Sequence, residues 1–151
     1  MEIEFILSQN DMPLIRLTEH TIQNLKFITA KTHKYIRQTR DITMRLKFEN
    51  AAVLIHQSSS EQVDNENEDE KPDEIETIRD LLEFAVSSYR KQLAYLDGSL
   101  SIVNESGQIF SYSYRNLFVL TYSEEFTRNT GITSINIHMR EKARSTLATS
   151  K

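Results

Sequence analysis

Residues 18–48 read TEHTIQNLKFITAKTHKYIRQTRDITMRLKF, and the fold expected for the chain depends on this stretch. Large side chains recur every three or four positions through residues 18–39, as they do on one side of a helix. These positions are Ile22, Leu25, Ile28, Thr32, Tyr35 and Ile36. Thr18 belongs to the residue types that cap the amino end of a helix. Residues 18–39 are therefore predicted to form a long amphipathic helix.

The period of the pattern changes after Asp41, where apolar and polar residues begin to alternate. Ile42, Met44, Leu46 and Phe48 would share one face of a strand. The following residues, 51–56, are apolar enough to return as a second strand of a hairpin.

A second long helix is predicted over residues 74–96. Asp73 and Glu76 resemble a capping box before it, and Gly98 suits the position after its end. Phe84 and Tyr95 fall roughly opposite the main apolar stripe of this helix. Large aromatic side chains outside a core stripe often anchor interfaces, so these two residues are candidates for a protein interface. The alternative is that other elements of the fold cover both sides of the helix.

Most of the remaining chain alternates with a period of two and is predicted to form strands. The predicted strands are 2–7, 14–17, 100–103, 108–114, 117–122 and 132–139. The expected fold class is α+β, with two long helices packed on one face of a mostly antiparallel sheet of about six strands.

The length of 151 residues suits one domain with one core, so residues 1–151 are expected to be a single domain. Residues 57–74 include twelve that are charged or Ser, and Val63 is their only large apolar side chain. They are expected to form an acidic, disordered, mobile loop inserted in that domain. Residues 140–151 are expected to be a polar carboxyl-terminal tail.

Several classes of function find no support in the composition. The chain has no cysteine, which excludes disulfides, thiolate metal sites and thiol nucleophiles. Its three glycines are isolated, so they cannot build a phosphate-binding loop. No signal peptide or membrane-spanning apolar run is visible. We therefore expect a cytoplasmic protein with no cofactor, no metal and no membrane partner.

The four histidines give little support for catalysis, because none has the spacing of a metal ligand set. His56-Gln57-Ser58 has the spacing of one half of a paired His-x-Ser phosphoesterase site, and the chain lacks the second half. A hydrolase site around His56 is a weak alternative.

Charge is distributed unevenly along the chain. Residues 26–47 hold seven Lys and Arg side chains and one acid, whereas residues 61–80 hold ten acids and two basic side chains. Basic side chains with an aromatic neighbour could bind a polyanion or nucleic acid. The candidates for such a site are Lys26, Phe27, Lys31, Lys34, Arg37, Arg40, Arg45 and Lys47. The competing interpretation is a solvated face whose charges balance the acidic segment.

These patterns together predict a non-enzymatic interaction module, such as an adaptor, an inhibitor or an assembly subunit. Its partner is expected to be a protein, either foreign or a second copy in a homo-oligomer. The alternative is a nucleic-acid-binding protein that uses the basic amphipathic helix.

Overall fold

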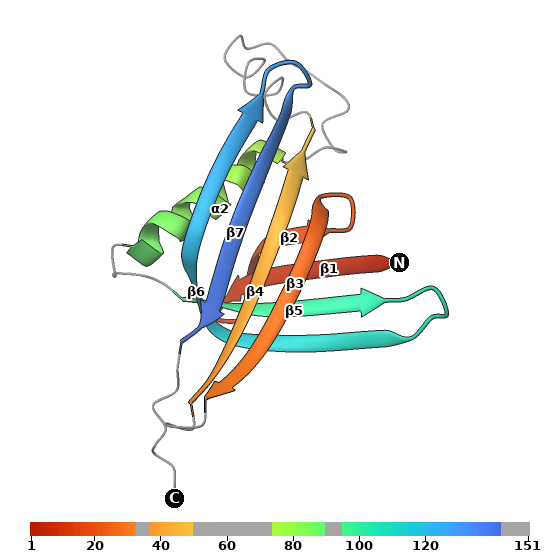
Figure 1. Cartoon of the computed structure of the whole chain (residues 1–151), viewed down its shortest axis with the longest axis vertical. Coiled ribbons are helices and arrows are strands. Elements are labelled where there is room, and N and C mark those ends of the chain that lie inside the picture. Colours follow the sequence, from red (N-terminus) through yellow and green to blue (C-terminus); the bar gives the residue numbers. More distant parts are fainter. Residues whose placement is uncertain (33–36, 50–73, 90–94, 143–151) are drawn as a thin grey trace, which may run out of the picture.

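The computed structural model describes residues 1–32, 37–49, 74–89 and 95–142, and these ranges contain seven strands and one helix (Figure 1). The helix, α2, is Glu74–Tyr89. The strands are β1 Glu2–Gln9, β2 Met12–Thr18, β3 Ile22–Thr32, β4 Arg37–Phe48, β5 Leu96–Val103, β6 Ile109–Thr127 and β7 Ile132–Glu141.

The seven strands form one antiparallel sheet in the order β2-β1-β5-β6-β7-β4-β3. The two outermost strands, β2 and β3, follow each other in the chain and are joined by a tight turn. In this turn the amide of Thr21 donates to the carbonyl of Thr18 at 2.9 Å, and Thr21 in turn accepts from the amide of Lys47 at 2.9 Å. Both edges of the sheet therefore meet at one corner of the molecule.

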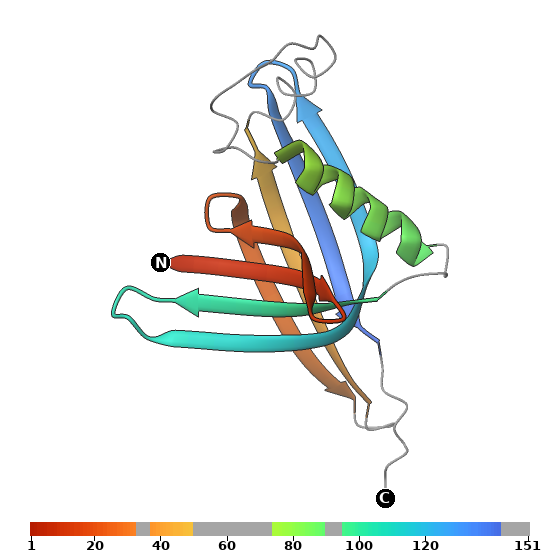
Figure 2. The same cartoon turned by 180° about the vertical axis from the view of Figure 1, so that it is seen from behind.

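The sheet bends at β6, which is 19 residues long and belongs to both halves of the fold. Its first part pairs with β5 and its second part pairs with β7, and the exchange occurs at Leu117. Asn116, just before this point, has a φ of 52°. The half with β1, β2 and β5 consequently crosses behind the half with β3, β4 and β7 (Figures 1 and 2).

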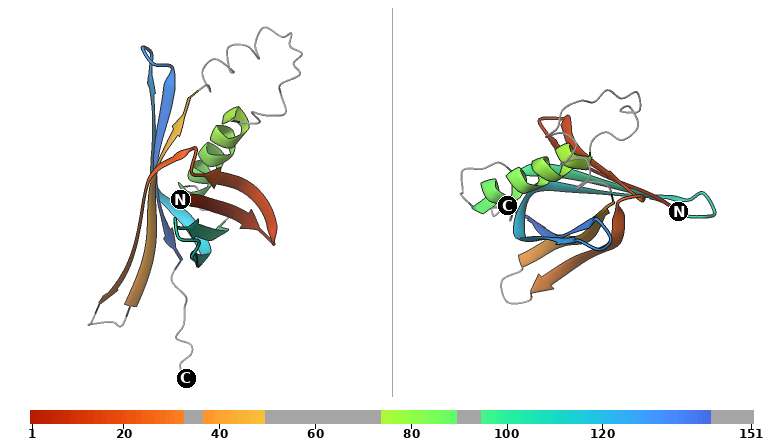
Figure 3. Two further views of the ribbon diagram at one scale, coloured as in Figure 1. Left: turned by 90° about the vertical axis from the view of Figure 1, so that its right-hand side faces the viewer. Right: turned by 90° about the horizontal axis from the view of Figure 1, so that it is seen from above.

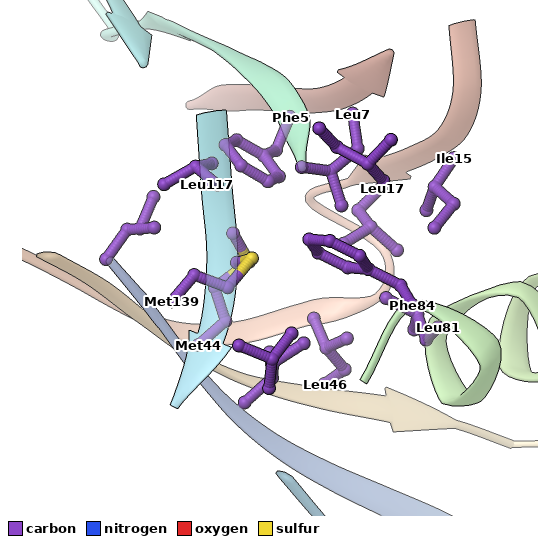
Figure 4. Packing of buried hydrophobic residues seen from close by; sticks show 14 of the residues in the cluster. Phe5, Leu7, Ile15, Leu17, Met44, Leu46, Leu81, Phe84, Leu117 and Met139 are labelled. Atoms are coloured by element: carbon purple, nitrogen blue, oxygen red, sulfur yellow. The ribbon is translucent and has the colours of Figure 1, made fainter. Parts of the chain in front are cut away.

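The hydrophobic core lies between the two crossing halves, and every described strand and α2 contribute to it. Within β4 the alternation is strict, because Ile42, Met44, Leu46 and Phe48 are buried and the residues between them are more exposed. The helix α2 contacts β6 and β2. It adds Leu81, Phe84 and Ala85 to the core, where Leu81 and Phe84 lie near Leu17 and Leu46 (Figure 4).

The predicted fold class is wrong, because the described chain is mostly antiparallel sheet with a single helix rather than two long helices on a sheet. The helix predicted over residues 18–39 is replaced by β3 and the start of β4. A break in the register between Ile22 and Asn24 accounts for the first part of the misleading pattern, whereas Ile28 is 49% exposed on the opposite face and belongs to no buried stripe. A bulge puts two residues of one strand opposite one residue of its partner, so Ile22 and Leu25 can share a face although they are three positions apart.

The second predicted helix exists but is shorter than expected. It ends at Tyr89, and by Leu96 the chain has entered β5. Gly98 is therefore a strand residue and does not end a helix. It faces the core, where a Cβ atom would lie 2.7 Å from Leu117 Cδ1 and 3.0 Å from Phe5 Cζ.

The strands predicted at residues 2–7, 14–17, 42–48, 100–103 and 132–139 are confirmed. The two strands predicted at 108–114 and 117–122 are parts of the single strand β6, which continues through residues 123–127 beyond the predicted strands. The start of the predicted tail, residues 140–141, belongs to β7. Residues 51–56, the acidic segment up to residue 73, and residues 143–151 lie outside the described residues.

Candidate interaction surface

The basic residues singled out in the sequence lie on the β3–β4 hairpin instead of on one face of a helix. Lys26 is opposite Thr43, and Arg45 is opposite Asn24. In β4, Thr43 and Arg45 alternate with core residues that point inward, so they point to the outer face of the sheet. Lys26 and Arg45 are therefore on the outer face, and both are exposed. Lys31, opposite Gln38, is exposed and lies on the inner side of the hairpin, as Phe27 does. The cations are thus divided between two faces.

Two further basic residues are engaged within the protein. Arg40 Nη1 lies 3.2 Å from Glu141 Oε2, and its guanidinium lies 4.6 Å from the centre of the Tyr114 ring. Lys47 Nζ lies 3.4 Å from Glu49 Oε2. Lys34 is outside the described residues, and the side chain of Arg37 is not described. The continuous basic helix face that the sequence suggested is therefore wrong, because its residues lie on a hairpin and two of them have acidic partners.

Phe27 belongs to a group of apolar side chains at the open end of the core. Its ring centre lies 4.6 Å from that of Tyr112 on β6, and its side chain is 37% exposed. Phe110, two residues before Tyr112 and on the same face, is 43% exposed. Ile3 and Ile102 are cross-strand neighbours in the row that includes Phe110. We call these five residues the aromatic shelf; it continues the core onto the surface beside β3.

β3 is an edge strand whose outer edge has no partner in the described part of the chain. It is 11 residues long, it contains no proline, and from Gln23 to Lys31 only Leu25 is not exposed. The opposite edge strand, β2, is 7 residues long, includes Pro13 and contacts α2. Short length, proline and covering elements are among the usual protections of a sheet edge, as are lysines and β-bulges. In the described chain β3 lacks the first three and has Lys26, Lys31 and a bulge near Ile22, and it lies along the outside of the molecule (Figure 3).

The two aromatic residues proposed as a protein interface have different environments. Phe84 is only 5% exposed and is part of the core, so it is not available on the surface. Tyr95 lies just before β5 and is 37% exposed. Its ring packs edge-on against Phe118 at 6.0 Å, and the ammonium group of Lys142 lies 4.9 Å from its centre. The predicted stripe misplaced Phe84 because α2 turns Leu81, Phe84 and Ala85 toward the core, while Leu82 is 42% exposed.

An ionic cluster on the outer face of β4 and β7 was not foreseen from the sequence. Asp41 accepts hydrogen bonds from Arg140 Nε at 2.8 Å and Arg140 Nη2 at 3.0 Å. Nε2 of His138 lies 2.8 Å from Asp41 Oδ2. The hydrogen bonds from Arg140 hold the pKa of Asp41 below its usual range despite partial burial, and His138 acts in the same direction. The strand alternation places all three outward, but only the β4–β7 pairing brings them together.

This cluster resembles half of a catalytic triad without completing one. Thr43 and Thr121 are the cross-strand neighbours of His138. Among the described residues, however, neither hydroxyl forms a hydrogen bond to the imidazole ring. Because Arg140 already occupies both oxygens of Asp41, the cluster fits a structural link between β4 and β7. His56, the residue of the weak hydrolase alternative, lies outside the described residues.

The described ranges contain a pocket, and they offer neither a metal site nor a membrane-spanning helix. No group of three or more His, Asp or Glu side chains there is arranged to hold a metal ion. No helix in those ranges is long and apolar enough to cross a membrane. A pocket of about 270 Å³ lies between α2 and β2, with Leu14, Ile15 and Phe84 among its apolar lining residues and Asp80 and Glu83 among its polar ones. Its volume is slightly below the roughly 300 to 1,000 Å³ typical of ligand sites.

Comparisons with known proteins add no assignment, since no family model, no curated protein and no solved structure matches the chain significantly.

Proposed function

We propose that the protein is a non-enzymatic interaction module that binds an extended segment of a protein partner at the outer edge of β3. The incoming segment becomes an additional strand of the sheet. The observation that carries this proposal is the length of β3 left without a strand partner in the described chain. Such an edge presents a row of backbone donors and acceptors that another strand can satisfy.

The aromatic shelf supports the same proposal, because strand addition requires side-chain contacts for specificity as well as backbone hydrogen bonds. Phe27 is exposed on β3 itself and contacts Tyr112, and Phe110 is exposed two residues from Tyr112, although apolar side chains gain free energy by leaving water. A strand added to β3 would send every second side chain toward the inner side of the sheet, where Phe27 lies.

The main support for the nucleic-acid alternative was a basic helix over residues 18–39, where the structure has β3 and the start of β4 instead. Lys26 and Arg45 are on one face, Lys31 is on the other, and Arg40 is paired with Glu141. A phosphate backbone would need these cations on one surface. The proposal therefore rests on the strand edge rather than on the number of basic residues.

Two proline variants, Ile28→Pro and Thr29→Pro, test the proposal. Adjacent residues of an edge strand direct their amide groups to opposite sides, so one of these amides bonds to β4 and the other faces outward. Proline at the residue whose amide bonds to β4 should lower the unfolding free energy by about 3 kcal/mol. Proline at the residue whose amide faces outward should be tolerated. Urea denaturation identifies the tolerated variant, which should have lost peptide binding.

Binding is measured by fluorescence anisotropy with labelled peptides that alternate Glu with Val or Ser with Val. A peptide alternating Glu with Pro has similar charge but cannot form a strand ladder. We expect at least one Val peptide to bind the wild type, and the Glu-Pro peptide to bind neither protein. Equal binding of the Glu-Pro and Glu-Val peptides, full binding by the tolerated proline variant, or no binding of either Val peptide at ~1 mM would each refute strand addition.

A further inference from the structure

The cations nearest the free edge of β3 lack acidic partners in the described chain. Lys26 and Lys31 are on β3 itself, and Arg45 is on the adjacent strand opposite Asn24. No described carboxylate lies within 4.0 Å of any of the three, whereas Arg40, Lys47 and Arg140 all have one. β3 contains no acidic residue. The edge therefore offers uncompensated positive charge to whatever strand pairs with it.

This charge acts against a second copy of the chain as the occupant. Antiparallel pairing of two β3 strands would bring two sets of Lys26 and Lys31 to one seam, with Arg45 of each copy one strand away from it. Like charges on neighbouring strands destabilise their pairing, and lysines on edge strands are a recognised means of preventing self-association. The same charges stabilise a strand of opposite sign.

The outer face and the inner side of the sheet at this edge favour different side chains on the incoming strand. Lys26 and Arg45 lie on the outer face, so acidic side chains are favoured there. Phe27 lies on the inner side next to Tyr112 and the aromatic shelf, so apolar side chains are favoured on the alternate positions. Lys31, farther along the inner side, favours one acid at that end.

We infer that the partner of β3 is an extended acidic segment of another protein, in which Asp or Glu alternates with apolar residues. This inference rests on the proposed strand addition and specifies the chemistry of the partner. It separates a foreign acidic strand from a second copy and from a nucleic acid, which has the negative charge but cannot form the strand ladder.

A charge-reversal experiment tests the inference. The variant Lys26→Glu/Lys31→Glu is compared with Arg79→Glu/Arg128→Glu, which changes the net charge equally at exposed positions on α2 and after β6. The probes are the Glu-Val and Ser-Val peptides, a Lys-Val peptide and a single-stranded polyuridine oligonucleotide. Light scattering on the unliganded wild type and variants reports self-association, and urea denaturation verifies that each variant is folded.

We expect the wild type to bind the Glu-Val peptide at least about fivefold more tightly than the Ser-Val peptide, and the Lys-Val peptide least. The β3 reversal should weaken Glu-Val binding about tenfold and improve Lys-Val binding, while the control pair changes either by less than about twofold. High salt should reduce the preference, because the charges are exposed.

Equal or tighter binding of the Ser-Val peptide would overturn the acidic partner and leave strand addition standing. A wild-type dimer that dissociates in the tolerated proline variant would assign the edge to a second copy. Polyuridine binding that the β3 reversal abolishes would assign the cations to nucleic acid. If no Val peptide binds, the proposed function fails as well, and this result is distinct from the other three.

Discussion

Gly98 shows how one residue sets the distance between two parts of the core. Its hydrogen occupies a position where a methyl group would approach the side chains of Leu117 and Phe5 to 2.7 and 3.0 Å. Gly98→Ala should therefore lower the free energy of unfolding by about 1–3 kcal/mol, as overpacking of a core does. Urea denaturation measures the change. Ser99→Ala, at the exposed neighbouring position, should change it by less than about 0.5 kcal/mol, and equal effects would contradict the close packing.

Asp41 gives the stability a dependence on pH in the acid range. The hydrogen bonds from Arg140, supported by His138, lower the pKa of Asp41 in the folded protein. In the unfolded chain its pKa is about 3.9. Its stabilisation is therefore complete above the unfolded pKa and is lost as the pH falls through the folded pKa.

Asp41→Asn should consequently cost about 1–2 kcal/mol of unfolding free energy at neutral pH, because Arg140 and His138 lose a charged acceptor. The difference from the wild type should shrink as the pH is lowered from about 5 to about 2, where the carboxyl group is also neutral. Urea denaturation of both proteins at several pH values measures it. A difference that stays constant over this range would show that the ionic cluster does not stabilise the fold.

At the scale of elements, the sequence predicted most strands whose alternation is regular. β4 keeps one face in the core, and its apolar and polar residues alternate strictly from Asp41 to Phe48. β1 and β7 also keep one face in the core, and their alternation is broken only at Ile6 and at the pair Thr133 and Ser134. β3 could not be predicted in this way because its register is broken near Ile22 and because most of its later residues are exposed on both faces. An edge strand with little buried surface carries a weak alternation signal.

Only part of the candidate site could be predicted, because most of it lies on β3. Lys26, Phe27 and Lys31 are candidate binding residues in the sequence because basic side chains stand beside an aromatic one, but the sequence pattern places them on the surface of a helix. The aromatic shelf was not found, because Phe27 meets Tyr112 only through the crossing of two sheet halves that are distant in the sequence. A helix model of residues 18–39 also hides the free edge, which is a property of backbone pairing and leaves no trace in composition. The physical origin of both errors is long-range strand pairing.

At the scale of the whole molecule, the chain places both sheet edges at one corner and protects them unequally. β2 is short, contains Pro13 and contacts α2, whereas β3 is long, contains no proline and has no covering element among the described residues. The most extended unpaired backbone in the described chain thus lies beside an exposed aromatic patch and uncompensated cations. This coincidence is the physical basis for assigning the β3 edge to a partner strand.

Amide hydrogen exchange of residues 24–32, with and without the Glu-Val peptide, tests this assignment most directly. In the free protein, alternate amides of β3 should exchange rapidly because every second one faces outward from the sheet. The peptide should slow exchange at these outward amides and leave the amides of β2 unchanged. Unaltered exchange throughout β3 under conditions in which the peptide is bound would contradict the account, because the peptide would then be held elsewhere.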